Sequence, residues 1–167
     1  MTRLRRFLLA AVVPALLVTS LGAAASRRPA LALVNESPSL PRGLYLRTPG
    51  TSPDRGAVVA LRQPSTVRPY LAALGMPGEV RLIKRVAATE GDAVCSDGRW
   101  LLAPGRIIRI ARHDRSGRPL PAWRGCRRLA EHERLVLGDT PSSFDGRYFG
   151  PITVAQIEGV YREAVTW

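Results

Sequence analysis

Lys84 is the only lysine among the 25 lysine and arginine residues of the chain. Arginine stays protonated in proteins, whereas a lysine held away from water can lose its proton. Lys84 stands in an apolar run with Leu82, Ile83 and Val86, and such surroundings lower a lysine pKa. At the ordinary pKa of about 10.4, roughly one lysine amine in a thousand is uncharged at neutral pH. Lys84 is therefore a candidate proton-accepting amine; the alternative is an ordinary charge on a strand edge.

Ser39 is the candidate partner of this amine. It stands in the stretch 35–45, Asn-Glu-Ser-Pro-Ser-Leu-Pro-Arg-Gly-Leu-Tyr. The two prolines and the glycine favour a stiff, turning backbone that displays the serine hydroxyl. A nucleophile needs such a backbone, because a displacement of about an ångström is costly in rate. The alternative is a proline-rich turn without a chemical role.

The elements that must position these two residues are mostly short strands. The 14 prolines, 15 glycines and short apolar runs favour a domain of strands and loops. A chain of 167 residues can bury one ordinary core, so one domain is expected after the N-terminal segment. Strands are predicted over 43–46, 55–61, 80–88, 93–95, 99–102, 107–111, 134–137 and 157–165, a short helix over 67–74 and an exposed loop over 113–121.

Residues 7–25 carry no charge and follow a basic lead-in. At a rise of 1.5 Å per residue this segment spans about 28 Å as a helix, close to the roughly 30 Å hydrocarbon core of a bilayer. The basic flank predicts that the N-terminus stays in the cytoplasm and that the rest is exported. A retained anchor and a signal peptide cut after Ala25 both remain open. The expected division is an N-terminal segment over 1–28 and one domain over 29–167.

Cys95 and Cys126 form an even pair in a domain predicted to be exported. A disulfide between them is expected; it would close a loop of about 30 residues and contribute roughly 3 kcal/mol. The two histidines, His113 and His132, have no ligand spacing with a cysteine. No metal or other cofactor is expected.

The net charge of +12 and the isoelectric point near 11.3 raise the question of nucleic-acid binding. The arginines, however, are scattered along the chain, and aromatic residues make up only 6% of it. A stacking platform for single strands is therefore poorly supplied. Nucleic acid is not an expected partner.

Three stretches together resemble the signal peptidase I superfamily of serine proteases (peptidase S26), most closely its conjugative-transfer, TraF-type branch. They are 39–45, then 82–86 followed by Gly91-Asp92, and then 145–151. They occur in the family's order behind an N-terminal hydrophobic segment. The resemblance implies a mainly β, signal-peptidase/LexA-like catalytic domain behind one hydrophobic helix. It also implies a membrane-associated endopeptidase with a Ser-Lys dyad.

Matched position by position, the resemblance makes Ser39 the nucleophile and Lys84 the general base. Neutral Lys84 takes the proton of the Ser39 hydroxyl and later passes it to the leaving amine. Ser37 matches a position whose hydroxyl helps the Ser39 backbone N–H to stabilise the oxyanion.

Three further positions match supporting residues of the family. Ser143 matches a hydroxyl that orients the lysine, and Asp145 and Arg147 match a charged pair that braces the site. The sequence departs from the general signal peptidases after Gly138-Asp139, where a longer acidic and asparagine-rich run is missing. This departure weakens the match of Ser143.

The resemblance also suggests the partners and the location. The expected substrate is an exported, pilin-like precursor bound as an extended peptide, and the expected lipid contact is through residues 7–25. The expected location is the bacterial inner membrane with the catalytic domain in the periplasm, or the periplasm if the segment is cleaved. The alternatives are a general signal peptidase, a non-catalytic exported β-domain and a LexA-like self-cleaving regulator. The last needs a DNA-binding domain, for which residues 1–38 leave no room.

Overall fold

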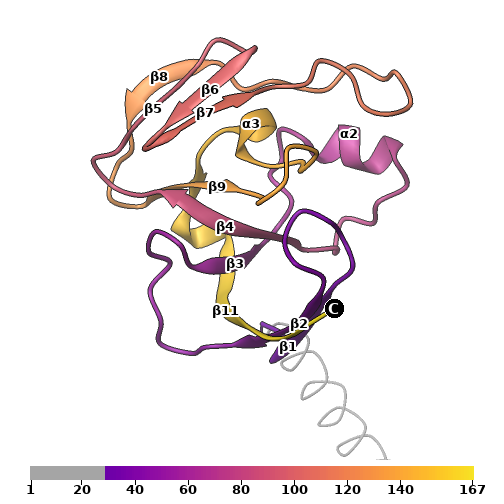
Figure 1. The fold of residues 1–167 in the computed structure, drawn as a ribbon, viewed down its shortest axis with the longest axis vertical. Coiled ribbons are helices and arrows are strands. Elements are labelled where there is room, and N and C mark those ends of the chain that lie inside the picture. Colours follow the sequence, from indigo (N-terminus) through magenta and orange to yellow (C-terminus); the bar gives the residue numbers. More distant parts are fainter. Residues whose placement is uncertain (1–28) are drawn as a thin grey trace, which may run out of the picture. The chain divides into compact units, whose positions relative to one another are not determined.

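The computed structural model describes residues 29–167. The predicted hydrophobic segment 7–25 lies outside the described residues. Within 29–167 the chain forms two antiparallel sheets and two short α-helices (Figure 1), so the prediction of a mainly β domain is confirmed. No helix in this part of the chain is long and apolar enough to cross a membrane.

The larger sheet has seven strands, and its central strands contribute residues to all three apolar core clusters of the described domain. Their spatial order is β1 (Ala32–Asn35), β2 (Gly43–Arg47), β11 (Ile157–Thr166), β3 (Val58–Leu61), β4 (Leu82–Ala88), β9 (Glu133–Leu137) and β10 (Ile152–Thr153). Each neighbouring pair is antiparallel. Strand β4 therefore lies between β3 and β9, with both edges paired.

The smaller sheet has four strands and lies at the opposite end of the described domain from β1 and β2 (Figure 1). Their order is β7 (Arg106–Arg109), β6 (Trp100–Ala103), β5 (Ala93–Ser96) and β8 (Gly125–Arg128). The helices are α2 (Arg68–Ala73), α3 (Gly146–Phe149) and a 3₁₀ turn over Val154–Gln156.

Side chains alternate between the two faces of β4, as expected for a strand. Leu82 and Val86 pack in one apolar cluster, and Ile83 packs in another on the opposite face. Lys84 shares its face with Leu82 and Val86, and it stands opposite Val59 of β3. The apolar run seen in the sequence is thus a buried strand that carries one amine into the core.

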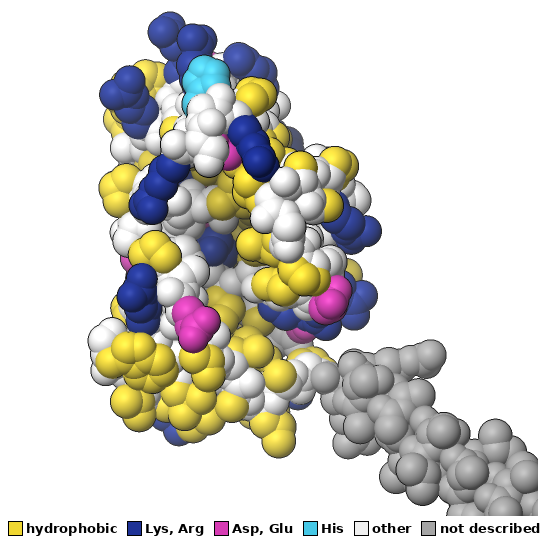
Figure 2. Space-filling view, turned by 90° about the vertical axis from the view of Figure 1, so that its right-hand side faces the viewer, with side chains coloured by type: hydrophobic (Ala, Val, Ile, Leu, Met, Phe, Trp, Pro, Cys, Tyr) yellow, Lys and Arg dark blue, Asp and Glu magenta, His cyan; other side chains and the backbone are white. Residues whose placement is uncertain are grey.

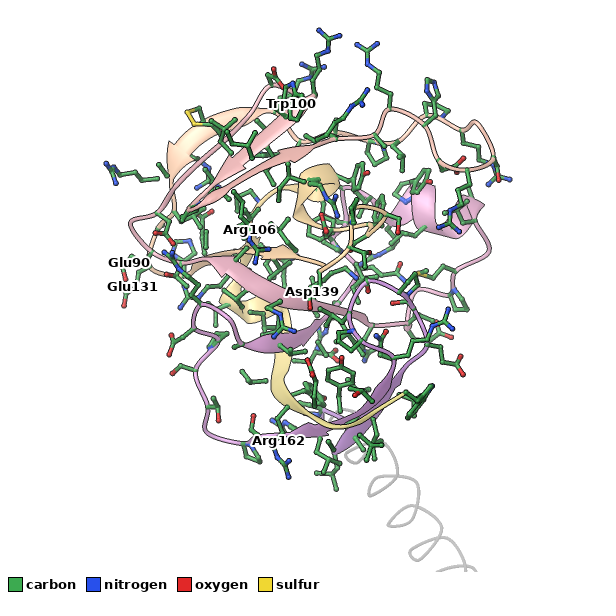
Figure 3. The ribbon with its side chains drawn as sticks, viewed as in Figure 1. Glu90, Trp100, Arg106, Glu131, Asp139 and Arg162 are labelled. Atoms are coloured by element: carbon green, nitrogen blue, oxygen red, sulfur yellow. A yellow bond between two sulfur atoms is a disulfide. The ribbon has the colours of Figure 1, made fainter. Side chains whose placement is uncertain are left out.

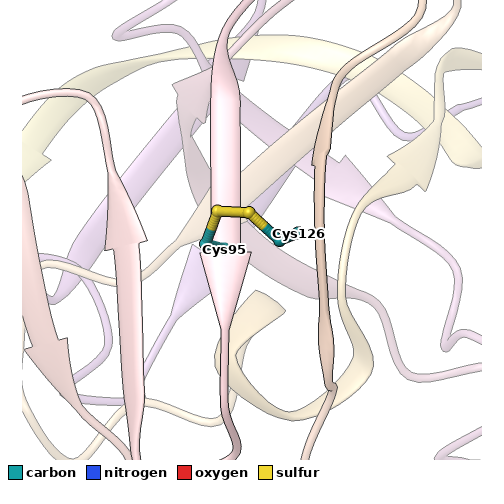
Figure 4. The surroundings of a disulfide bond; sticks show 2 residues. All are labelled: Cys95 and Cys126. Carbon is teal, nitrogen blue, oxygen red and sulfur yellow. A yellow bond between two sulfur atoms is a disulfide. The ribbon is translucent and has the colours of Figure 1, made fainter.

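Cys95 of β5 and Cys126 of β8 are directly paired in register and joined by a disulfide (Figure 4). The predicted disulfide is confirmed. It ties the two strands of the smaller sheet that lie farthest apart in sequence.

The predicted strands and the predicted helix are present, with small differences at their ends. The strands β1, β8 and β10 and the helix α3 were not predicted. Each is four residues or shorter. Such short segments offer too few positions for a periodic pattern, and their pairing partners decide their structure.

Candidate active site

Ser39 lies in the loop that joins β1 to β2. Its side chain is buried, with only 5% of the residue exposed. The Asn35 side chain, at the end of β1, holds this loop from inside. Its amide nitrogen donates to the backbone carbonyls of Ser37, Leu40 and Pro41 at 3.0, 3.1 and 3.0 Å. The Tyr45 hydroxyl donates to the same Pro41 carbonyl at 2.7 Å.

Lys84 reaches this loop from the middle of β4. The residue is 4% exposed. Its Nζ donates to Ser39 Oγ at 3.0 Å and to the Ile83 carbonyl at 2.9 Å. The two residues that the sequence singled out therefore lie in direct contact.

Burial lowers the pKa of Lys84 from its ordinary value to about 8. Removal of the amine from water is the largest cause, because desolvation disfavours the charged form. The Asp145 carboxylate acts in the opposite direction and the Arg147 guanidinium lowers the pKa further. A pKa near 8 gives a neutral amine in useful amount at physiological pH.

The Ser37 hydroxyl lies beside that of Ser39. The two Oγ atoms are 2.7 Å apart, and Ser37 Oγ donates to Asn35 Oδ1 at 2.9 Å. Asn35 Oδ1 also accepts the Ser37 backbone N–H at 3.2 Å. The Ser39 backbone N–H makes no hydrogen bond with any other described residue, so it is free to serve an incoming oxygen.

Asp145 and Arg147 form a buried ion pair. They are 0% and 2% exposed, and Arg147 Nη2 and Nε lie 2.7 and 2.8 Å from the two carboxylate oxygens. Arg147 also donates to the backbone carbonyls of Thr140, Pro141 and Ser143. The pair therefore holds the segment that runs from β9 to α3 in place.

This segment also contacts the Ser39 loop directly. The Asp139 backbone N–H donates to the Ser39 carbonyl at 2.6 Å; Asp139 is labelled in Figure 3. Gly138 donates its N–H to Asp145 Oδ2 at 2.8 Å. A side chain at Gly138 would place its Cβ 2.1 Å from Ser143 Oγ and 2.8 Å from the Ser39 carbonyl oxygen. The close approach of the two loops requires glycine at this position.

The predicted site residues Ser37, Ser39, Lys84, Asp145 and Arg147 are thus brought together. The Ser143 side chain is buried near Gly138, but its Oγ makes no hydrogen bond with Lys84 or any other described residue. The Ile83 carbonyl is the second acceptor for the Lys84 amine. The lysine-orienting role of Ser143 stays a prediction.

Two contributors to the site, Asn35 and Gly138, were not predicted from the sequence. Asn35 precedes a turn, a position where asparagine often bonds the nearby backbone; this signal was available. The need for glycine at 138 depends on a contact with a loop about 100 residues away, so no local pattern indicates it. A serine hydroxyl 3.0 Å from a desolvated amine, with a free backbone N–H beside it, can carry out nucleophilic attack on a carbonyl.

Comparisons with known proteins identify the family of the chain. The family model described as signal peptidase, peptidase S26, matches residues 3–167. A plasmid transfer protein TraF of Escherichia coli is 34% identical over 168 residues, which cover 93% of this chain and 91% of that protein. A second TraF from the same organism is 34% identical over 149 residues, 81% of this chain and 84% of that one.

A solved signal peptidase I from Enterococcus faecalis also aligns with the chain. The alignment covers 66% of this chain and 97% of the other, with 23% identity and a TM-score of 0.39. The family match and the TraF relatives span nearly the whole sequence. The chain belongs to the signal peptidase, peptidase S26, family.

Proposed function

We propose that the protein is a membrane-associated serine endopeptidase that removes a leader or terminal segment from an exported, pilin-like precursor of a conjugative transfer system. The observation that carries the proposal is the 3.0 Å contact between Lys84 Nζ and Ser39 Oγ in a buried site. Membership of a peptidase family supports a peptide substrate. The plasmid transfer names of the two relatives support a role in conjugation.

In the proposed first step, neutral Lys84 accepts the proton of the Ser39 hydroxyl while Oγ attacks the carbonyl carbon of the scissile bond. The negative charge on the carbonyl oxygen is stabilised by the Ser39 backbone N–H and the Ser37 hydroxyl. The Ser37 hydroxyl then turns from Asn35 towards this oxygen. The protonated Lys84 donates its proton to the leaving amine as the C–N bond breaks, which leaves an ester on Ser39.

The second step restores the enzyme. A water molecule attacks the ester carbonyl while Lys84 accepts one of its protons. The C–Oγ bond breaks, Ser39 Oγ regains a proton from Lys84, and the product leaves with a new carboxyl group. Asp145 and Arg147 act on neither bond; they hold the segment that borders the Ser39 loop.

A membrane-facing site is supported by the surface next to this loop. Val34 of β1, Leu44 of β2 and Val165 of β11 form one cross-strand row, and Val34 and Val165 are exposed. Leu31, just before β1, and Trp167, just after β11, are exposed as well. Figure 2 shows hydrophobic side chains gathered at this end of the described domain. Exposed apolar patches of this kind mark interaction sites. We propose that residues 7–25, within an anchor or leader over 1–28, contact the membrane and that the peptidase domain, residues 29–167, lies at its periplasmic face.

The disulfide between Cys95 and Cys126 supports the same location, because disulfides persist in oxidising compartments. A general signal peptidase would use the same residues, so the substrate separates the two functions.

The test is cleavage of full-length precursors encoded beside this protein and of an unrelated secreted precursor, by wild type and Ser39→Ala. Mass spectrometry of the products locates the cut. The proposal expects cleavage of one transfer-region precursor, no cleavage by Ser39→Ala, and little cleavage of the unrelated precursor. Equal cleavage of both precursors would show a general signal peptidase, and cleavage by Ser39→Ala would exclude Ser39 as the nucleophile.

A further inference from the structure

An open pocket of about 860 Å³ lies beside strands β6 and β7 of the smaller sheet. It is also lined by residues 110–113, which follow β7, and by Pro141. Three arginines, Arg99, Arg109 and Arg112, line it together with Trp100 and His113, and no aspartate or glutamate is among its described lining residues. Trp100, labelled in Figure 3, is on β6. Figure 2 shows basic side chains gathered at this end of the domain. The pocket therefore presents positive charge without internal neutralisation.

The arginines of this pocket differ from eleven of the sixteen other arginines in residues 29–167, whose side chains have partners within the protein. Six of these eleven form ion pairs with carboxylates: Arg55, Arg62, Arg81, Arg85, Arg127 and Arg147. The other five donate to backbone carbonyls: Arg68, Arg118, Arg124, Arg128 and Arg134. The side chains of Arg109 and Arg112 make no hydrogen bond or ion pair with another described residue. The guanidinium of Arg99 makes no hydrogen bond with another described residue and has only a longer-range attraction to the Asp97 carboxylate. These guanidiniums are available to an external anion, and arginine binds carboxylates through two parallel hydrogen bonds.

A second, mostly apolar pocket of about 430 Å³ adjoins the first. Both are lined by Ala111, His113 and Pro141. The apolar side chains of the second pocket come from α2, from the 111–120 loop and from the segment before α3: Leu71, Leu74, Met76, Leu120 and Phe144. Together the two pockets form a groove with a mostly apolar part and a cationic part. One carboxylate, Asp114, lines the apolar part, where it accepts a hydrogen bond from the Tyr70 hydroxyl at 2.9 Å.

Pro141 connects this groove to the candidate active site. It lies two residues after Asp139, whose backbone N–H bonds the Ser39 carbonyl at 2.6 Å. Two residues of chain span at most about 8 Å. The hydrogen bond and the covalent bonds on its two sides add about 6 Å, so the Cα of Pro141, on the shared rim of the pockets, lies within about 14 Å of the Ser39 Cα. An extended peptide covers this distance with about four or five residues at about 3.3 Å each.

We propose that this groove binds an acidic segment of the peptide substrate, a few residues from the scissile bond. An apolar side chain of that segment enters the second pocket, and its carboxylates bind Arg99, Arg109 and Arg112. The inference rests on the proposed peptidase function and adds a substrate class to it: precursors with acidic residues near the cleavage site. The groove has a cationic pocket beside an apolar one, which suits the mixed side chains of a peptide. Single-stranded nucleic acid binds by stacking its bases on several aromatic side chains, and Trp100 is the only tryptophan, tyrosine or phenylalanine among the described residues that line the cationic pocket.

The first test measures binding alone. A fluorescein-labelled peptide of alternating leucine and glutamate, and a matched peptide with glutamine in place of glutamate, are titrated into full-chain Ser39→Ala. The same titrations follow in Ser39→Ala with Arg109→Gln and Arg112→Gln added. Tighter binding of the acidic peptide, reduced about tenfold or more by the two arginine changes, is expected. Equal affinities for the two peptides, or no effect of the arginine changes, would overturn the inference.

Arg162→Gln is the control, because Arg162 is an exposed arginine on β11, in the other sheet, whose side chain makes no hydrogen bond or ion pair with another described residue. It should leave the affinity unchanged, and equal melting temperatures of all variants show that they fold. An arginine-dependent preference for a single-stranded oligonucleotide or for phosphatidylglycerol vesicles over the acidic peptide would contradict a peptide partner.

The second test separates this inference from the proposed function. Precursors that differ only in glutamate or glutamine near the cut are given to wild type and to Arg109→Gln/Arg112→Gln. For the glutamate precursor, the double variant should have a KM about tenfold higher than wild type and the same kcat. For the glutamine precursor, both KM and kcat should equal those of wild type. A wild type that cleaves neither precursor would contradict the peptidase. A wild type that cleaves both with equal KM would contradict only the arginine groove.

Discussion

The Nζ of Lys84 lies 3.0 Å from the Oγ of Ser39, although 45 residues separate them in the sequence. One comes from a buried strand with both edges paired, and the other from a loop whose carbonyls bond Asn35, Tyr45 and the Asp139 backbone N–H. The same burial that brings the amine to the hydroxyl lowers its pKa to about 8. Position and protonation of this amine therefore have one cause, the packing of β4 in the core.

The pH dependence of cleavage follows from this pKa. A general base works only when neutral, and below pH 8 the neutral fraction of Lys84 falls tenfold for each pH unit. We expect kcat/KM to rise with pH with a slope of about one and to level off above about pH 8. The measurement uses a peptide without groups that titrate in this range. Activity that keeps rising to pH 10 would mean that the amine is not desolvated.

Asp145→Asn should affect both stability and this pH profile. It leaves the Arg147 guanidinium buried without its carboxylate, and breaking such a pair costs about 3–5 kcal/mol. Because the Asp145 carboxylate raises the pKa of Lys84, its neutralisation should move the midpoint of the activity profile below that of wild type. Urea unfolding and the pH profile of the remaining activity measure the two effects.

The matched control is Arg62→Gln, which breaks an ion pair whose arginine is mostly exposed. It should cost less than about 1 kcal/mol and leave the profile in place. If Asp145→Asn costs no more than Arg62→Gln, the buried pair does not brace the site.

Asn35→Asp should impair cleavage without touching either dyad residue. The aspartate keeps an acceptor for Ser37 but turns a carboxylate oxygen towards the three loop carbonyls that the amide now serves. We expect kcat to fall about 10- to 100-fold as the Ser39 loop shifts. Tyr45→Phe, which removes only the other donor to the Pro41 carbonyl, is the control. Wild-type kcat in a folded Asn35→Asp enzyme would show that Asn35 does not position the loop.

Gly138→Ala tests the contact between the two loops. Its new Cβ would fall 2.1 Å from Ser143 Oγ and 2.8 Å from the Ser39 carbonyl, so the Ser39 loop must move. We expect a loss of about 1–3 kcal/mol in stability and at least tenfold in kcat/KM. Gly78→Ala, where nothing lies within 4 Å of a new Cβ, should change neither quantity. Equal effects of the two substitutions would show that the loops tolerate a side chain between them.

The sequence was sufficient to predict the strand of Lys84, the displayed Ser39 and the disulfide, because each depends on local composition or on a simple pairing rule. It did not predict what Asn35 and Gly138 do, because both act through contacts with a folded loop. The second acceptor of the Lys84 amine, the Ile83 carbonyl, is a backbone group with no sequence signature. The lysine-orienting role of Ser143, which the resemblance implies, stays a prediction, because its Oγ makes no hydrogen bond with another described residue.

The arginine groove shows a further limit. In the sequence the arginines of the groove are scattered among many others. No local pattern distinguishes them from the arginines that pair with carboxylates. Only the folded strands β6 and β7 and the following loop bring Arg99, Arg109 and Arg112 to one pocket. Scattered charge in a sequence therefore does not exclude a concentrated charge on the surface.

The most direct test of the Ser-Lys dyad is the cleavage rate of Lys84→Arg beside that of wild type, on a precursor that wild type cuts. Arginine keeps the positive charge and the reach of lysine but cannot become neutral. The dyad predicts a loss of at least about a thousandfold in kcat in a protein that still folds, as judged by its circular dichroism and melting temperature. Cleavage by folded Lys84→Arg within about tenfold of wild type would contradict Lys84 as the general base.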